Sequence, residues 1–289
     1  MTDRISGSVF KQMVLFGAAC ITLERETIND LNVFPVPDGD TGTNMSLTIQ
    51  TAAAELKKNQ PATVSDAASI TASALLRGAR GNSGVILSLL FRGISKHLKG
   101  MDEADGVLLA AAMKEGVATA YSAVMKPAEG TVLTVSRLAA DRAVQAAEEC
   151  NSVEYVLQEA IHKGLETLEE TIEMNPVLKK AGVVDAGGKG YLVILDGMLR
   201  ALRGEPIPEV TEEKAESKAD FSAMSQEEIT FTFDTVFIVR KWENTSIEPL
   251  RAYLSSIGDC LVIGEDDEAF KVHVHTDIPG CALTEAQKY

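Results

Sequence analysis

Basic residues are scarce in this chain of 289 residues. Only 27 lysines and arginines stand against 42 aspartates and glutamates, which leaves a formal net charge of −15 at pH 7. A nucleic-acid partner requires a basic surface, so this balance argues against one. An anionic small ligand would meet a repulsive background field, and it would need a cation or a helix N-terminus to bind.

Cysteines and long apolar runs are also few. The four cysteines are widely spaced and form no C-x-x-C pair, which is typical of a reduced cytoplasmic protein and not of a disulfide framework. No stretch approaches the ~20 apolar residues of a membrane span, and the first seven residues lack the cationic lead and apolar run of a signal peptide. We therefore expect a cytoplasmic protein with no integral membrane segment.

Helical periodicity dominates the first two hundred residues. Apolar side chains recur at helical spacing over 8–31, 44–56, 64–77, 84–98, 102–125, 131–149, 153–173 and 188–202. Breaks that contain glycine or proline separate most of these segments. About eight helices with short loops predict a helical bundle or barrel at residues 1–203.

The composition changes after residue 203. Residues 204–225 are polar, charged and proline-containing, which predicts a linker. Alternating β-branched and aromatic residues then predict strands at 229–233, 236–239, 260–263 and 270–275, with one helix at 247–257. Residues 226–289 are thus expected to begin a small α+β domain. The last residues fall inside an expected helix, so we expect this domain to continue beyond residue 289.

The loop NVFPVPDGDTGTN at residues 32–44 carries the most informative chemistry. Asp38 and Asp40 can place two carboxylates on one Mg²⁺, which takes oxygen ligands from a few carboxylates, phosphates and water. Thr41, Thr43 and Asn44 can add oxygens or bind phosphate at the start of the next helix. These residue types are also common in turns, so the loop alone is equally consistent with a capped turn.

Three further glycine-bearing loops join expected helices, at residues 78–84, 126–131 and 184–190. Small residues let backbone N–H groups approach an anion, although no G-x-x-x-x-G-K-[ST] phosphate loop is present. Each loop alone is as readily a turn or a close helix contact. In a barrel of antiparallel helices, however, such loops can gather at one end and form a cup for a nucleotide.

Two histidines lie on one face of the last expected strand. His273 and His275 alternate with valines, and this spacing can offer two imidazoles to one metal ion. Taken alone, two exposed or hydrogen-bonded histidines are the more frequent explanation.

These motifs resemble those of a known kinase family. Residues 32–45, 78–88 and 182–190 resemble the nucleotide-binding L-domain of dihydroxyacetone kinases. Residues 31–45, 79–88 and 124–131 are closer still to the ATP-binding subunit of bacterial fatty acid kinase. The resemblance covers essentially the whole chain. It implies an eight-helix antiparallel barrel followed by part of an α+β middle domain.

The resemblance also assigns roles to individual residues. It implies that Asp38 and Asp40 hold two Mg²⁺ ions that bridge the phosphates of ATP. Dihydroxyacetone kinases have a third aspartate where this chain has Val33, and the adjacent Asn32 is the expected substitute. The remaining expected contacts to the nucleotide are Thr41, Thr43, Asn44, Gly81, Asn82 and Ser83 near the phosphates, and Thr131, Asp185 and Gly187 near adenine and ribose.

The middle domain of the related subunits carries a cysteine on its first strand, and that cysteine and the paired histidines form a metal-type group important to activity. Here Asp234 stands where the cysteine would fall. Aspartate is an acceptable Zn²⁺ ligand, though a harder one than thiolate. We therefore expect a functional group of Asp234, His273 and His275 that binds Zn²⁺, with phosphoryl relay through a histidine as the competing role.

The activity that the resemblance implies is transfer of phosphate from MgATP to the carboxylate of a fatty acid, which a separate binding protein carries. The product is an acyl phosphate, and the family suggests a homodimer. Two alternatives remain: a dihydroxyacetone-type kinase subunit, which the attached β-rich domain disfavours, and a nucleotide-sensing module that controls a partner without turnover.

Overall fold

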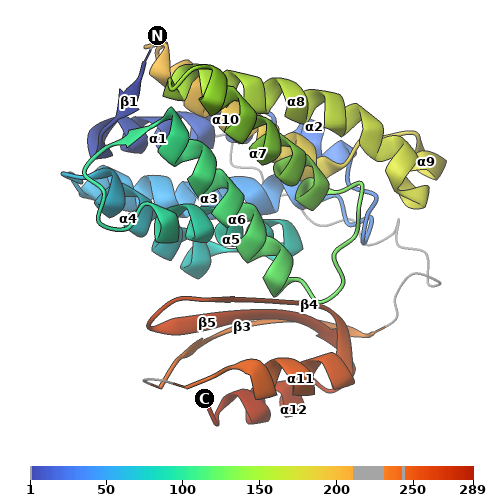
Figure 1. Ribbon diagram of the computed structural model, residues 1–289. Coiled ribbons are helices and arrows are strands. Elements are labelled where there is room, and N and C mark those ends of the chain that lie inside the picture. The colour runs from blue at the N-terminus through green and yellow to red at the C-terminus, as the bar shows by residue number, and fades with distance from the viewer. Residues whose placement is uncertain (1, 211–230, 243–244) are drawn as a thin grey trace.

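A computed structural model of the protein describes residues 2–210, 231–242 and 245–289. Figure 1 shows a helical unit stacked against one face of a small sheet, with two further helices on the opposite face. No helix in these described ranges is both long and apolar enough to cross a membrane.

The helical unit contains eight long helices within residues 7–202, all of which the structure describes. Each has between 15 and 22 residues. They are α1 (Gly7–Leu23), α3 (Thr41–Lys58), α4 (Val64–Gly78), α5 (Gly81–His97), α6 (Gly106–Ala123), α7 (Val132–Glu149), α8 (Val153–Met174) and α10 (Ala186–Leu202). Two short helices, α2 (Arg25–Asp30) and α9 (Pro176–Ala181), and a two-residue strand pair, β1 (Arg4–Ile5) with β2 (Ala104–Asp105), complete the unit.

Short polar side chains fix where several of these helices begin. Thr63 and Asp66 form a reciprocal capping box at the start of α4, and the carboxylate of Asp105 accepts the N–H of Leu108 at the start of α6. Such caps satisfy backbone N–H groups that have no partner inside the helix. The helix starts can therefore be located from the sequence.

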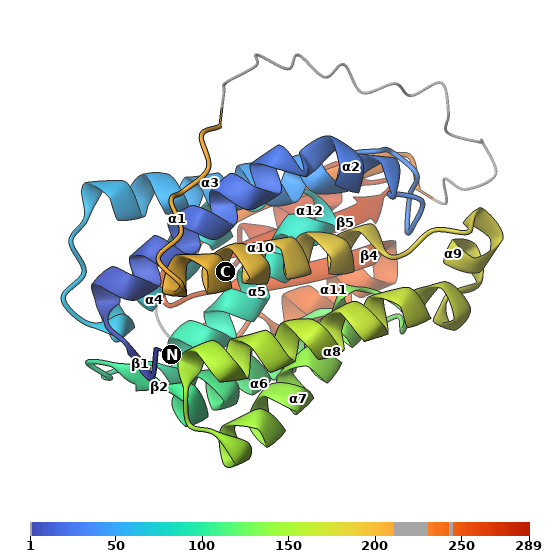
Figure 2. The same ribbon diagram turned by 90° about the horizontal axis from the view of Figure 1, so that it is seen from above.

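The first and last long helices close the unit. A Cβ atom added at Gly197 of α10 would lie only 2.8 Å from the Cα of Gly17 in α1, so the two backbones touch. Figure 2 shows α1 and α10 side by side. The core between the helices is rich in buried alanine, valine and leucine, as the periodicity of the sequence predicts.

The long helices alternate in direction, so their loops collect at two ends. At one end, the start of α8 and the end of α10 meet at Thr2, which bonds Glu154 and Leu202. At the other end, the start of α10 meets the end of α8, because Asp185 N–H donates to Thr171. The starts of α3, α5, α7 and α10 share this second end (Figure 2).

The sheet has three antiparallel strands in the order β3 (Phe233–Arg240), β5 (Ala269–Thr276) and β4 (Gly258–Glu265). Alternate residues of β5 face opposite ways. Phe270, Val272 and Val274 pack with α11 (Glu248–Ile257) and α12 (Pro279–Ala286) in a second apolar core. Lys271, His273 and His275 lie on the other face, toward the helical unit.

The sheet packs directly against the helical unit through β4 and β5. Val262 of β4 belongs to the apolar core of the helical unit and pairs with Val124 just after α6. A Cβ at Gly264 would lie 2.9 Å from Leu76. On β5, the ammonium of Lys271 donates to the backbone carbonyls of Arg77 and Ala79. The two units therefore share apolar and polar contacts.

Some sequence expectations differ from the structure. The helix expected at 8–31 is two helices that meet at Glu24. The strand expected at 236–239 is longer, because β3 pairs with β5 without interruption from Phe233 to Arg240. Of the strand expected at 229–233, only Phe233 belongs to β3, and residues 229–230 lie outside the described part of the chain. Of the expected linker, residues 211–225 lie outside the described part of the chain.

Candidate functional site

The first glycine-bearing loop brings two carboxylates to the start of α3. Asp40 is the N-cap residue of α3, and its carbonyl accepts the N–H of Asn44 at 2.8 Å. Asp38 lies two residues earlier, beyond Gly39, whose φ of +67° turns the chain. This backbone conformation suits glycine. The Asp40 carboxylate makes no capping bond to the helix and lies beside that of Asp38.

The Asp38 carboxyl has a raised pKa in this loop. Crowding by loop atoms, followed by the charge of Asp40, raises the pKa of Asp38 to about 7. Like charges held close together disfavour ionisation of both groups. A divalent cation bound between the two carboxylates would neutralise this repulsion while both groups stay ionised. Because the donor atoms here are oxygens, the loop fits Mg²⁺ better than a softer metal.

The side chain of Asn32 stabilises this loop through hydrogen bonds. Its amide NH₂ donates to the carbonyl of Val36 at 2.6 Å and to Asp38 at 3.1 Å, and its side-chain oxygen accepts the hydroxyl of Thr41. Asn32 thus holds Asp38 in place, and its only side-chain oxygen already has a partner. Its expected role as a third metal ligand stays a prediction, one that this geometry disfavours.

The nearby threonines are also engaged within the protein. The backbone N–H and hydroxyl of Thr43 both contact the side-chain amide of Asn29, each at 3.0 Å. With the hydroxyl of Thr41 bound to Asn32, both side chains order the first turn of α3. Their backbone N–H groups, at a helix N-terminus, are the natural contacts for an anion.

The second glycine-bearing loop lies against the first turns of α3. Arg80 N–H donates to the hydroxyl of Thr48 at 3.1 Å, and a Cβ at Gly81 would lie 2.4 Å from the side-chain amide of Asn44. Gly81 also has φ of +55°. These contacts bring together the N-termini of α3 and α5. The side-chain oxygen of Asn82 is buried there with no hydrogen-bond partner, so it is available to a ligand; Ser83 follows it in the first turn.

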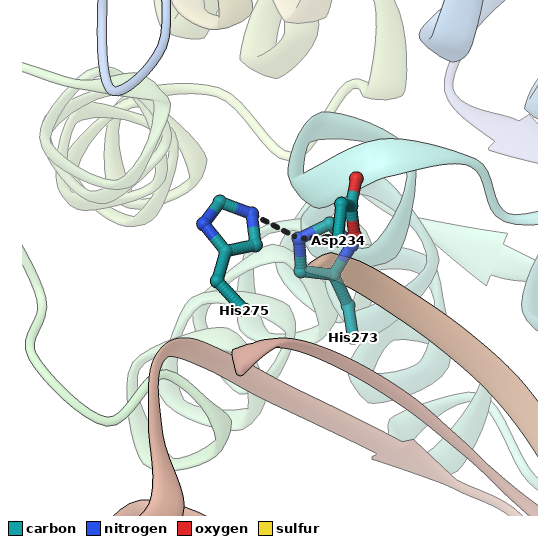
Figure 3. Close-up of side chains that lie close together, drawn as sticks. All are labelled: Asp234, His273 and His275. Atoms are coloured by element: carbon teal, nitrogen blue, oxygen red, sulfur yellow. Dashed lines mark hydrogen bonds and ion pairs between the residues drawn. The ribbon is translucent and has the colours of Figure 1, made fainter. Parts of the chain in front are cut away.

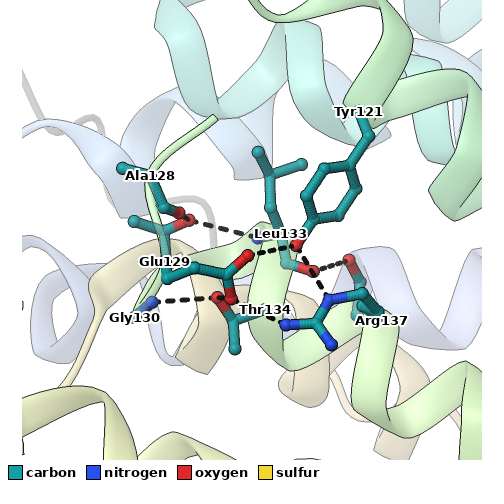
Figure 4. Close-up of polar contacts among 9 residues, drawn as sticks. Tyr121, Ala128, Glu129, Gly130, Leu133, Thr134 and Arg137 are labelled. Atoms are coloured by element: carbon teal, nitrogen blue, oxygen red, sulfur yellow. Dashed lines mark hydrogen bonds and ion pairs between the residues drawn. The ribbon is translucent and has the colours of Figure 1, made fainter. Parts of the chain in front are cut away.

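The third loop is organised by a carboxylate that sequence reasoning missed. Glu129 accepts hydrogen bonds from Tyr121 (3.2 Å), Thr134 (2.8 Å) and Arg137 (2.7 Å), as Figure 4 shows. Partial burial opposes ionisation, but the bonds from Thr134 and Arg137 hold the pKa of Glu129 below its ordinary value. Only the acid in the loop was visible in the sequence; its partners come from α6 and α7.

The N-caps of α7 and α10 form the remaining part of this end. The hydroxyl of Thr131 accepts the N–H of Leu133 at 3.3 Å. The buried carboxylate of Asp185 accepts the N–H of Gly188 at 2.6 Å and also bonds the backbone of Val132. Asp185 therefore ties the start of α10 to the start of α7. Burial raises its pKa to about 6 against the hydrogen bonds that favour its charge.

Gly187 lies in the first turn of α10, where a Cβ would come within 3.3 Å of Val132. Thr131, Asp185 and Gly187, expected near adenine and ribose, are thus brought together by the structure. Asp38, Asp40, Gly81 and Asn82, expected near metal and phosphate, lie at the same end of the helical unit.

The raised pKa of Asp185 predicts a pH-dependent loss of stability. The protonated form is favoured in the fold, so the contribution of this group is complete below the unfolded pKa near 4 and is lost as the pH rises through about 6. Relative to the wild type, Asp185→Asn should therefore gain about 2 kcal/mol in free energy of unfolding between pH 4.5 and pH 7.5. Urea unfolding at both pH values measures this difference.

Asp105→Asn is the matched control, because Asp105 caps α6 at the opposite end and its bond to Leu108 lowers the pKa. Asp105 stays ionised throughout this pH range, so its variant should differ from the wild type by a nearly constant amount. A pH-independent difference for Asp185→Asn as well would contradict the assignment of the raised pKa.

The sheet carries a second group of candidate residues. Figure 3 shows the rings of His273 and His275 beside the carboxylate of Asp234. The Nε2 atoms of the two rings lie 3.2 Å apart, and the Nε2 atom of His273 lies 3.5 Å from Asp234 Oδ1. Their potential ligand atoms lie within 4.8 Å of one another, so the structure brings together the three residues expected to bind a metal ion.

Burial favours the neutral form of His273 in this group. The side chain of His273 is 2% exposed, whereas that of Asp234 is 59% exposed. Burial lowers the pKa of His273 to about 4, although Asp234 opposes the shift. A neutral imidazole is the form that binds metals. The Nδ1 atom of His273 is buried without a partner, and the nitrogen and oxygen donor set fits Zn²⁺.

Two neighbours of this group were not expected from the sequence. Asp259 and Cys260, at the start of β4, form a second group with His275 in which the ligand atoms again lie within 4.8 Å of one another. Burial, followed by the charge of Asp259, raises the pKa of the Cys260 thiol to about 12. The sequence shows an acid beside a cysteine but not the strand register that places them at His275.

Lys271 connects the two candidate regions. It lies on the same strand and face as His273, and its ammonium is bound to the carbonyls of Arg77 and Ala79, which lead into the loop at Gly81. Burial and the nearby Arg80 lower its pKa. The sheet thus holds the end of α4 at the point where the second glycine-bearing loop begins.

Two family models match the chain. Residues 35–200 match the model described as the DAK2 domain, and residues 230–289 match the model of the FakA-like middle domain, which is described as that of a fatty acid kinase subunit. An uncharacterized protein of Staphylococcus saprophyticus is 40% identical over 298 residues, covering 100% of this chain and 54% of the relative. An uncharacterized protein of Staphylococcus aureus strain USA300 is 39% identical with the same coverage. The chain spans about half the length of these curated relatives.

The fold is similar to that of a solved kinase. The crystal structure of the dihydroxyacetone kinase of C. freundii in its native form matches 70% of this chain and 36% of that chain, with a TM-score of 0.53 and 18% sequence identity. This likeness concerns the fold. It confirms the expected class, a helix-rich unit resembling the kinase L-domain and followed by a small antiparallel sheet.

Proposed function

The chain belongs to the family of DAK2-domain proteins that carry a FakA-like middle domain, and on that premise we propose that it is the ATP-binding subunit of a fatty acid kinase. In this proposal the γ-phosphate of MgATP passes to the carboxylate of a fatty acid held by a separate binding protein. The product is an acyl phosphate. We further propose that the protein acts in the cytoplasm as a homodimer.

The observation that carries the proposal is the meeting of two helix N-termini beside a pair of carboxylates. The starts of α3 and α5 are in contact through Asn44 and Gly81, and Asp38 and Asp40 lie directly before α3. Helix N-termini attract phosphate. In a chain with a net charge of −15, a polyphosphate needs such local attraction.

The residues at this end of the helical unit would have different roles in the reaction. Asp38 and Asp40 would hold Mg²⁺, which neutralises phosphate charge when it is bound. The backbone N–H groups of the first turns of α3 and α5, with Asn82 and Ser83, would bind and orient the phosphates. Phosphoryl transfer requires mainly positioning and charge neutralisation, so no side chain of this unit has to attack the phosphate.

Thr131, Asp185 and Gly187 would line the adenine and ribose pocket. Asp185 already carries two backbone hydrogen bonds, so its second role is to keep the starts of α7 and α10 together. On the sheet, Asp234, His273 and His275 would hold Zn²⁺. Because Lys271 joins this strand to the phosphate-binding loop, the metal group and the nucleotide site can influence each other.

A phosphotransfer assay tests the proposal. The full-length protein is given γ-labelled MgATP together with a candidate binding protein loaded with fatty acid. Labelled acyl phosphate is separated, and its identity is checked with hydroxylamine, which should release the label as inorganic phosphate and leave an unlabelled acyl hydroxamate. We expect labelled acyl phosphate only when the loaded binding protein is present, and none with Asp38→Asn. Dihydroxyacetone is the parallel acceptor.

Two outcomes contradict the proposal. Label on dihydroxyacetone and not on the fatty acid would make the protein a dihydroxyacetone-type kinase subunit. Label on neither acceptor, despite tight MgATP binding and a series of binding proteins, would make it a nucleotide-sensing module.

A further inference from the structure

His275 lies on the central strand between two acidic residues. Asp234 of β3 is opposite His275 on one side, and Asp259 of β4 is opposite it on the other. The Nε2 atom of the His275 ring is 3.2 Å from His273, whereas its Nδ1 atom is 3.7 Å from the carboxylate of Asp259. The ring therefore has one nitrogen near His273 and the other near Asp259. Only the nitrogen near His273 belongs to the group of Asp234, His273 and His275 proposed above.

A β-bulge brings a thiol to the second side. Asp259 pairs with His275 and Val262 pairs with His273, so three steps along β4 match two steps along β5. In a regular strand, Asp259 and the next residue, Cys260, would point to opposite faces. The extra residue removes this constraint, and the carboxylate, the thiol and a ring nitrogen of His275 lie within 4.8 Å of one another.

The backbone at Cys260 is strained to achieve this. Its φ is +51°, the only positive φ of a non-glycine residue in the described part of the chain. Glycine would adopt this conformation without strain, yet the residue present carries a thiol. Strained backbone of this kind is concentrated at functional sites, and a thiol aimed at an imidazole and a carboxylate is a metal-binding arrangement.

We propose that Asp259, Cys260 and His275 form a separate site for Zn²⁺, adjacent to the group of Asp234, His273 and His275. Thiolate, imidazole and carboxylate are the three ligand types that zinc takes in proteins, and they leave a fourth position for water or a partner. Mg²⁺ would prefer oxygen ligands alone. All three side chains are partly exposed, so a cation can enter from solvent. The thiol proton is released to water on binding, and the ring proton of His275 is released as well when both groups hold a metal ion.

Cobalt substitution tests this site independently of any kinase activity. The full-length protein, purified without a metal-binding tag and stripped with chelator, is titrated with Co²⁺ and then with Zn²⁺. The wild type should show the near-ultraviolet absorption of a thiolate–cobalt bond. Cys260→Ser should lose this absorption and bind one fewer zinc ion per chain, while Cys281→Ser, which alters an exposed cysteine of α12, should keep both.

Two further variants separate this site from its neighbour and from a purely structural role. Asp234→Asn, which alters an exposed side chain outside the site, should keep the thiolate–cobalt absorption. Cys260→Gly should lose the absorption yet raise the unfolding temperature of the metal-free protein by a few degrees, because glycine relieves the strain. The proposal is overturned if the wild type lacks the absorption or if Cys260→Ser retains it. It is also overturned if Asp234→Asn abolishes the absorption, because the thiol would then belong to the same metal site as Asp234.

Discussion

Replacing Asp38 or Asp40 by asparagine is expected to lower the Mg²⁺-dependent affinity for ATP by about 100-fold or more, which corresponds to about 3 kcal/mol. Each carboxylate is a direct ligand in the proposed site, and the amide that replaces it is neutral. The bond from Asn32 to Asp38 shows that this carboxylate is held in one orientation. Isothermal titration calorimetry with and without Mg²⁺ measures the effect.

The stability of the same variants provides an internal check. Burial, followed by the charge of Asp40, raises the pKa of Asp38, so the ionised pair is unfavourable in the metal-free protein. Removing one charge should raise the unfolding temperature of the metal-free protein at pH 8 while nucleotide binding is lost. Asp196→Asn, an exposed change on α10, should alter neither property. Unchanged ATP affinity in both site variants would remove Asp38 and Asp40 from the metal site.

Gly81→Ala is the second variant with a large expected effect. The change adds a Cβ that would lie 2.4 Å from the amide of Asn44, at a residue whose φ of +55° already disfavours alanine. Asn44 must move, and with it the contact between the starts of α3 and α5. We expect the affinity for MgATP to fall by about 10-fold or more, equivalent to about 1.4 kcal/mol.

Gly100→Ala is the control for backbone strain. Gly100 has φ of +81°, but an added Cβ there meets nothing within 4 Å, and it follows α5 at the far end of the helical unit. Both variants should lower the unfolding temperature by a few degrees, since each costs about 1 kcal/mol of backbone strain. Only Gly81→Ala should weaken nucleotide binding. Equal losses in the two variants would show that general destabilisation, and not the loop, is responsible.

Much of the helical unit follows from local sequence signals. Segments rich in helix formers, most of them separated by breaks with glycine or proline, locate the eight long helices. Thr131 and Asp185 stand at helix starts because their side-chain oxygens accept backbone N–H groups. The gathering of four loops at one end follows from the alternation of direction. The break at Glu24 does not, because the apolar periodicity continues from α1 into α2 and no glycine or proline lies at the break.

The candidate sites were predictable to the extent that they lie within one segment. Asp38 and Asp40 share a loop, and His273 and His275 share a strand face, so their proximity follows from spacing alone. Glu129 and its partners, and Cys260 beside His275, depend on contacts between elements. The contact of Cys260 with His275 in particular requires a β-bulge between Asp259 and Val262. The bulge changes which face of the sheet the side chains point to. No residue pattern in this part of the sequence indicates where the bulge lies.

The contact of Val262 with the helical core has a practical consequence for dissecting the protein. The two family matches, at 35–200 and 230–289, suggest a cut between them, but Val262 of β4 belongs to the apolar core of the helical unit. A piece ending at residue 203 would expose the surface on which Gly264 packs against Leu76, and it would leave the carbonyls of Arg77 and Ala79 without Lys271. We therefore expect a fragment that retains the sheet to keep the second glycine-bearing loop in its present shape better than one that ends at residue 203.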